Sequence, residues 1–195
     1  MSRLKPLSPE TTPELKSHFD FFLGTLGFTP NSVLTMQRKP HLVKAFAQLN
    51  AAVMTPEGEV DLGFRRLIGH MASKASGCLY CQAHTLLGAK NFGIADDKLA
   101  AMWNYASSDL YTPAEKIALD FALAAASQPN AVTDDLFAEL SRHWSEGQIV
   151  EILGVVAMFG FLNRWNDSMA TPLEAVPEQV AKEAAKEHGF HKGKH

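Results

Sequence analysis

The sequence lacks the features that would assign it to several large classes of protein. Its 195 residues include only two cysteines, which excludes a secreted scaffold held by several disulfides. The net charge is −3 with neutral histidines, and no basic stripe or tail argues for nucleic-acid binding. Neither a signal-like apolar segment near the start nor an unbroken run of about 18 apolar residues occurs. We therefore expect a cytoplasmic protein that binds neither nucleic acid nor a membrane.

The longest apolar stretch, residues 149–162, is too short to span a bilayer and contains Glu151. We interpret it as a buried helix. A buried carboxylate needs a partner, and Arg164 is a candidate.

Apolar residues recur at spacings of three and four along most of the chain, which is typical of amphipathic helices. Thr112, Pro113 and Glu115 form a capping-box signature before one such segment. The pattern predicts an all-α fold of roughly eight helices, the main segments being residues 15–26, 40–54, 61–76, 78–91, 96–105, 113–127, and two beginning at 133 and 145. We expect one helical domain over residues 1–174. Residues 175–195 are expected to form a polar tail, loosely attached over residues 182–195, in which His188, His191 and His195 face solvent.

The only two cysteines occur together in the stretch ASGCLYCQAHTLLGAK, at Cys78 and Cys81. Residues three apart on a helix lie on one face with Cα atoms roughly 5 Å apart, which a disulfide can bridge. Gly77 indicates that the pair opens a helix, where free N–H groups favour a thiolate. His84 follows Cys81 by one turn and could exchange protons with it.

Three interpretations of this stretch stay open on the residues alone: a redox centre, a metal site and two buried structural thiols. Covalent haem attachment is excluded because Gln82 stands where a histidine is required. A zinc site would need Cys78, Cys81, His84 and His70 together, at an unusual spacing. Leu79 and Tyr80 are expected to point elsewhere and to serve packing.

The segment Cys-x-Tyr-Cys-x-Ala-His, after a helix that ends in Ser-Gly, resembles the AhpD-like, carboxymuconolactone decarboxylase family. Residues 112–116 and 163–167 resemble its peroxidase-related branch, and the resemblance covers about residues 42–173. It implies an AhpD-like helical bundle that assembles into a homo-oligomer, a trimer or hexamer. It also implies alkylhydroperoxidase and disulfide-reductase chemistry that needs no organic cofactor.

The same resemblance assigns roles to the two cysteines. Cys81 would attack the hydroperoxide and become a sulfenic acid, and Cys78 would resolve it to a disulfide that an external dithiol protein reduces. The position of Cys78 at the helix start favours it as the more acidic thiol, whereas His84 lies nearer to Cys81.

The chain departs from the family pattern at two positions. The relay glutamate is replaced by Arg66, and Thr85 stands where the relay histidine falls, with His84 one residue earlier. His70 lies one turn after Arg66 and could take over the proton transfers, while Arg66 could hold a thiolate or an anionic substrate.

The leading hypothesis is a thiol-dependent oxidoreductase, a peroxidase with Cys81, Cys78, His84 and His70 as catalytic residues and Arg66 at the substrate. Two alternatives remain. One is a decarboxylase of the carboxymuconolactone type, which would not depend on thiols. The other is a non-enzymatic oligomer that senses oxidants or binds a metal.

Overall fold

The computed structural model describes residues 2–186 and 188–195, and this part of the chain contains helices and no strand. The predicted all-α fold is confirmed. Ten α-helices are present in place of the roughly eight expected: α1 (Lys16–Leu26), α2 (Asn31–Met36), α3 (Pro40–Val53), α4 (Leu62–Ala75), α5 (Leu79–Asn91), α6 (Asp96–Ala100), α7 (Pro113–Ala126), α8 (Asp134–His143), α9 (Glu146–Met169) and α10 (Ala175–Ala184). Three short 3-10 helices, η1 (Pro9–Thr11), η2 (Pro13–Leu15) and η3 (Ala101–Asn104), complete the list.

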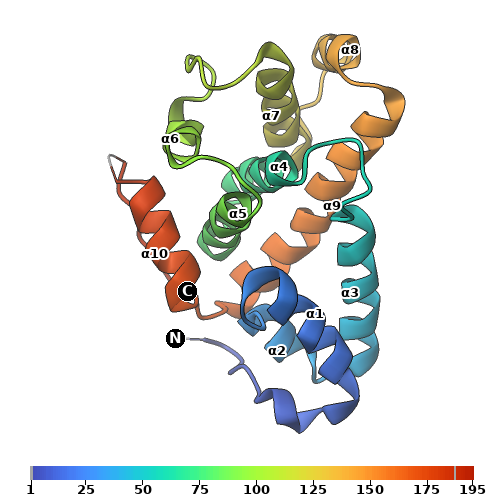
Figure 1. Cartoon of the computed structure of the whole chain (residues 1–195), viewed down its shortest axis with the longest axis vertical. Helices are drawn as coiled ribbons and strands as arrows, with labels where there is room; N and C mark the ends of the chain where they lie inside the picture. Colours follow the sequence, from blue (N-terminus) through green and yellow to red (C-terminus); the bar gives the residue numbers. More distant parts are fainter. Residues whose placement is uncertain (1, 187) are drawn as a thin grey trace.

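Helices α4 and α5 form an antiparallel hairpin at the centre of the molecule (Figure 1). The long helix α9 and helix α7 both pack on α4, and α3 packs along α9. On the other side α10 packs on α5, so the hairpin is covered by helices that follow it in the chain.

Local capping explains where three of these helices begin. The Thr112 hydroxyl accepts a hydrogen bond from Glu115 N at 3.2 Å, and the Glu115 carboxylate accepts one from Thr112 N at 2.9 Å. This is the reciprocal arrangement that the sequence predicted. Ser145 and Gln148 form a second capping box at the start of α9, and Asp61 caps α4 by accepting from Phe64 N.

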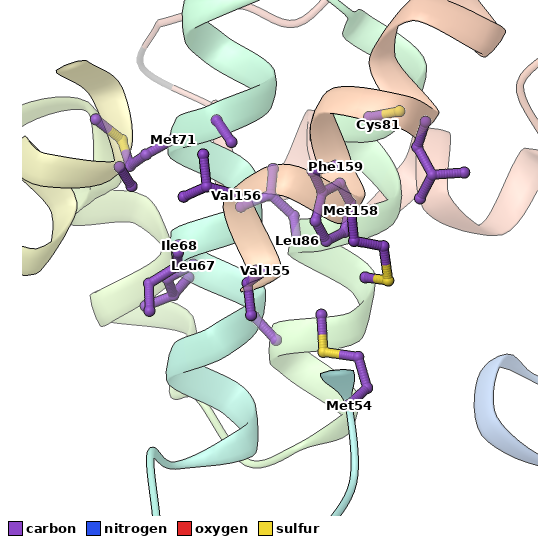
Figure 2. Close-up of a cluster of buried hydrophobic side chains, with 14 of the residues drawn as sticks. Met54, Leu67, Ile68, Met71, Cys81, Leu86, Val155, Val156, Met158 and Phe159 are labelled. Atoms are coloured by element: carbon purple, nitrogen blue, oxygen red, sulfur yellow. The ribbon is translucent and has the colours of Figure 1, made fainter. Parts of the chain in front are cut away.

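The core lies between α4 and α9 (Figure 2). Leu67, Ile68 and Met71 of α4 are fully buried against the apolar face of α9 that contains Val155 and Phe159. The two helices approach closely at Gly69, where an added Cβ would lie 2.4 Å from the Phe159 ring. Helix α9 is long and apolar enough to cross a membrane by length and composition alone, but its buried residues make it the central core helix of this domain, as the sequence indicated.

A buried ion pair joins α4 to α9. Arg65, whose side chain is 1% exposed, donates from Nη2 to Glu151 Oε2 at 2.8 Å and from Nη1 to the carbonyl oxygens of Val53 and Thr55. The Glu151 carboxylate also accepts from the backbone N–H groups of residues 59 and 60. The sequence suggested Arg164 as the partner of Glu151, and this prediction is wrong. Arg164 lies on an exposed face, and its Nη1 donates to the Gly160 carbonyl one turn away.

The end of the chain is folded onto the domain. Residues 175–184 form α10, with Ala181 fully buried, so this part is not the polar tail expected. His195 is buried as well, whereas it was expected in solvent. The polar composition of this segment hid its packing, because α10 is short and amphipathic. Its narrow alanine face is enough to pack on α5.

Replacing Glu151 by alanine is expected to lower the free energy of unfolding by about 3 kcal/mol, because it leaves the Arg65 charge buried without its partner. Chemical denaturation measures this value. Glu57→Ala, at an exposed loop carboxylate, is the control and should change stability little.

The Glu151 carboxylate should also make the free energy of unfolding depend on pH in the acidic range. Burial opposes ionisation of Glu151, but the N–H groups of Val60 and Glu59 and the Arg65 charge outweigh it and lower its pKa below 4.5. The stabilisation is therefore present above the unfolded pKa and is lost as the pH falls through the folded one. A difference between wild type and Glu151→Ala that did not shrink in acid would contradict this account.

Candidate active site

The two cysteines lie where α4 turns into α5. Gly77 adopts a left-handed φ of 69°, which ends α4 and turns the chain back. Cys78 is then the N-cap of α5, and its N–H donates to the Ser73 carbonyl at 3.1 Å. The predicted position of the pair at a helix start is confirmed.

Both cysteines are free thiols, and their exposed fractions are 0% for Cys78 and 2% for Cys81. A hydrogen bond from Cys81 outweighs burial and, with a further contribution from His195, lowers the pKa of Cys78 to about 6. Burial, followed by the neighbouring Cys78, raises the pKa of Cys81 well above its usual value. One negative charge is thus shared by the pair and rests mainly on Cys78.

Cys81 lines an apolar pocket that encloses about 560 Å³ including its open mouth. The walls come from α1, α2, α3 and α9 and are mainly the apolar side chains Phe22, Leu26, Val33, Phe46, Phe159 and Leu162. The polar groups in the lining include Arg66, Tyr80, His84 and Asn166. The pocket therefore unites three of the predicted site residues, Cys81, His84 and Arg66, whereas Cys78 and His70 are outside its lining.

Asn166 and Glu174 contact the site from distant parts of the chain. Asn166 of α9 donates from Nδ2 to Cys81 Sγ at 3.4 Å. The Glu174 carboxylate lies 2.7 Å from His84 Nε2, and it also accepts from the Tyr80 hydroxyl at 2.9 Å and from Asn31 N. Burial opposes ionisation of Glu174, but the His84 charge and the hydrogen bonds from His84 and Asn31 N outweigh it and lower the pKa of Glu174.

Tyr80 was expected only to pack, and this is wrong. Its ring stacks on His84 with centroids 4.3 Å apart, and its hydroxyl holds Glu174. The tyrosine thus fixes the orientation of both the histidine and the carboxylate.

His70 is buried between α4 and α5 and is in contact with α5 groups. Its Nδ1 lies 3.2 Å from Thr85 Oγ1 and 3.3 Å from the Gln82 carbonyl. Burial lowers its pKa to about 4, so the ring is neutral at physiological pH. Its part in proton transfer stays a prediction.

His195 is a site residue that no pattern in the sequence indicated. Its Nδ1 lies 3.1 Å from the Thr171 carbonyl, and its Nε2 lies 3.6 Å from Asp167 Oδ1. Its side chain helps to lower the pKa of Cys78. If Nδ1 donates to Thr171, Nε2 is left as the atom that can accept the thiol proton.

The four-residue zinc set considered from the sequence is not supported. Within residues 2–186 and 188–195, no three His, Cys, Asp or Glu side chains are grouped so as to hold a metal ion. His84 is turned to Glu174 and His70 to Thr85, which directs both rings away from a shared site.

The pair should show one thiolate well below neutral pH. Titration of the reduced protein, followed by thiolate absorbance in the ultraviolet, is expected to give one group near pH 6, the pKa of Cys78, and a second only at strongly alkaline pH. The low-pH step should be lost in Cys78→Ser and move upward in His195→Gln, because each change removes a group that stabilises the charge. The absence of thiolate below pH 8 in the wild type would contradict the assignment.

Comparison with known proteins agrees with this fold. The family model described as carboxymuconolactone decarboxylase family matches residues 40–124. The debrominase Bmp8 is 34% identical, with 92% of this chain and 96% of that chain covered and a TM-score of 0.87. A Cys→Ala variant of Bmp8, crystallised with 2,3,4-tribromopyrrole, is 33% identical over 94% of this chain and 98% of that chain, with a TM-score of 0.89.

Two more distant proteins are also similar. An AhpD-core, peroxidase-related protein from Ralstonia eutropha is 23% identical, with 94% of this chain and 96% of that chain covered and a TM-score of 0.78. The protein YnjA of Escherichia coli is 25% identical over 123 residues, which are 62% of this chain and 68% of YnjA. The family model and these similarities agree with the cysteine motif, and the chain belongs to the AhpD-like, carboxymuconolactone decarboxylase family.

Proposed function

We propose that this protein is a thiol-dependent oxidoreductase in which the Cys78–Cys81 dithiol reduces a small apolar electrophile. The observation that carries the proposal is that the two cysteines differ in their access to the pocket and in their acidity. Cys81 faces an apolar pocket, and its neighbour Cys78 is an acidic thiol that stays out of it. A structural pair of thiols would need neither feature.

The first substrate class is a hydroperoxide. Cys81 sulfur attacks the terminal oxygen, the O–O bond breaks, and the alkoxide leaves as an alcohol after taking a proton. Cys78 thiolate then attacks the sulfenic acid sulfur and expels hydroxide, which leaves as water once protonated. The sum is one hydroperoxide and two thiols giving an alcohol, water and a disulfide, which an external dithiol protein must reduce.

The resting charge and the attacking atom are on different cysteines, so a proton must move within the pair. Cys81 passes its proton to Cys78 across their hydrogen bond as the substrate meets Cys81 in the pocket. His195 then accepts the proton when Cys78 becomes the resolving thiolate, and Asp167 stands beside the resulting imidazolium.

His84 is proposed to serve the leaving group. Glu174 occupies its Nε2, and Tyr80 stacks on the ring, so that Nδ1 is the atom left for proton exchange. Glu174 takes the place, in this arrangement, of the relay glutamate that the chain replaces with Arg66. Asn166 keeps Cys81 sulfur directed at the pocket.

A second substrate class, a halogenated aromatic ring, is favoured by two observations. Bmp8 is a debrominase, and the pocket has the aromatic walls Phe22, Phe46 and Phe159. Cys81 sulfur would take the halogen, the ring carbon would take a proton, and Cys78 would displace halide to form the same disulfide. The stoichiometry is one aryl halide and two thiols giving the arene, hydrogen halide and a disulfide. A decarboxylase would not need the acidic thiol of Cys78, and a passive oxidant sensor would not need the pocket.

Turnover assays with dithiothreitol as the reductant distinguish these possibilities. The wild type is expected to reduce cumene hydroperoxide, tribromophenol or both, and Cys81→Ser to lose about a thousandfold or more in kcat/KM, because the attacking sulfur is gone. Gln82→Ala, next to Cys81 but outside the pocket lining, is the control and should stay active. Full activity of Cys81→Ser, or of an alkylated protein, would exclude thiol chemistry and favour the decarboxylase alternative.

The expected homo-oligomer is proposed to form through the outer face of α3 and α9. Leu49, Val150 and Leu153 expose 45%, 70% and 46% of their surface there, and Ala52 and Val150 line one shallow apolar hollow between the helices. Burying such a face against a second copy would remove its apolar surface from water.

Light scattering after size exclusion measures the subunit count. Val150→Asp combined with Leu153→Asp should reduce the assembly to a monomer, because it places charges in the proposed interface. Val176→Asp, on the exposed side of α10, is the matched control. A wild type that is monomeric, or an assembly that survives the double change, would exclude this face.

A further inference from the structure

Helix α4 presents two consecutive buried arginines whose surroundings differ completely. Arg65 is 1% exposed, and its two Nη atoms bind Glu151, Val53 and Thr55. Arg66 is 8% exposed, yet none of the residues described, 2–186 and 188–195, forms an ion pair or a hydrogen bond with it. Its Nε, like that of Arg65, is buried without a partner.

The chain makes specific room for the Arg66 side chain. Gly88 of α5 faces it, and an added Cβ there would lie 2.9 Å from Arg66 Cδ and 3.1 Å from Nε. The guanidinium lies 5.5 Å from the centre of the Phe92 ring. From this slot Arg66 lines the same pocket as Cys81 and His84.

A buried charge without a partner is costly, and an apolar pocket wall makes it more so. Burial lowers the pKa of Arg66 to about 10, which still leaves the guanidinium charged at neutral pH. Glu174, which contacts the pocket residues Tyr80 and His84, directs its oxygens to His84, Tyr80 and Asn31 and forms no ion pair with Arg66. Cys81 does not compensate the Arg66 charge, because its thiol is kept protonated.

We propose that Arg66 is an anion anchor and that the substrate is a small apolar molecule with one anionic group, a carboxylate or an ionised ring O–H or N–H. The guanidinium holds the anion, and the apolar walls hold the rest of the molecule against Cys81 sulfur. This inference rests on the proposed function, because it assigns the substrate of the same pocket. It restricts that function to organic acids and phenol-like molecules among the hydroperoxides and aryl halides.

A pair of ligands that differ only in charge tests the anchor without turnover. Isothermal titration calorimetry compares 4-bromobenzoate with 4-bromobenzamide on the full chain carrying Cys78→Ser and Cys81→Ser, which cannot undergo thiol chemistry. In this parent protein the benzoate is expected to bind about tenfold or more tightly than the amide, since a charged group makes the stronger hydrogen bond.

Substitutions of Arg66 test whether this residue causes the preference for the benzoate over the amide. Arg66→Met in the same background should bind both ligands with similar affinity, and Arg66→Lys should keep a preference for the benzoate. Arg164→Met removes an exposed arginine outside the pocket lining and should change nothing. If Arg66→Met does not fold, Arg66→Gln makes the same comparison.

Equal binding of the two ligands to the parent protein, no binding of the benzoate, or a preference that survives in Arg66→Met would overturn the proposal. These outcomes are separate from the fate of the proposed function, because the thiols are absent from the binding assay. If the unmodified protein turns over substrate through its thiols, but its double-serine variant binds 4-bromobenzoate no more tightly than 4-bromobenzamide, the redox function stands and the anion anchor is excluded.

Discussion

The antiparallel contact of α4 with α5 is the constraint on which the rest of the structure depends. Gly77 turns the chain within three residues, and the two helices then stay in contact from His70 and Thr85 to Arg66 and Gly88. This contact places Cys78 at the start of α5 and Cys81 one turn later. Apolar side chains of α9 cover α4, so that Cys81 is held on α5 at the edge of the core (Figure 2).

Elements that are distant in sequence complete the site around this hairpin. Helix α9 supplies Asn166, the turn after it supplies Glu174, and the end of the chain brings His195 beside Cys78. Each of these groups acts on a charge or a proton, whereas the hairpin itself supplies the sulfur atoms. The opposite acidities of the two thiols follow from this arrangement, because a hydrogen bond from Cys81 favours a charge on Cys78, whereas burial and the neighbouring Cys78 oppose a charge on Cys81.

Local signals in the sequence predicted the helical fold and the cysteine pair correctly. The capping box at Thr112 and the turn at Gly77 are properties of a few neighbouring residues, which is why they could be recognised. The packing of α10, the Arg65–Glu151 pair and the Tyr80–Glu174 hydrogen bond depend on residues about 85 or more positions apart. No periodicity encodes such contacts, so Arg164 was an equally reasonable partner for Glu151 until the helices were placed. Arg66 was recognised only as a departure from the family pattern, and its lack of a partner is visible only in three dimensions.

The most direct test of the central claim is the intact mass and free-thiol count of the reduced protein after one equivalent of substrate, with and without a dithiol reductant. If Cys78 and Cys81 form a working dithiol, both thiols disappear together, the mass falls by two hydrogen atoms, and the reductant restores both values. Cumene hydroperoxide and tribromophenol serve as the two substrates. A folded protein whose thiols remain free with both would contradict the account, and the pair would then be part of the packing of α5.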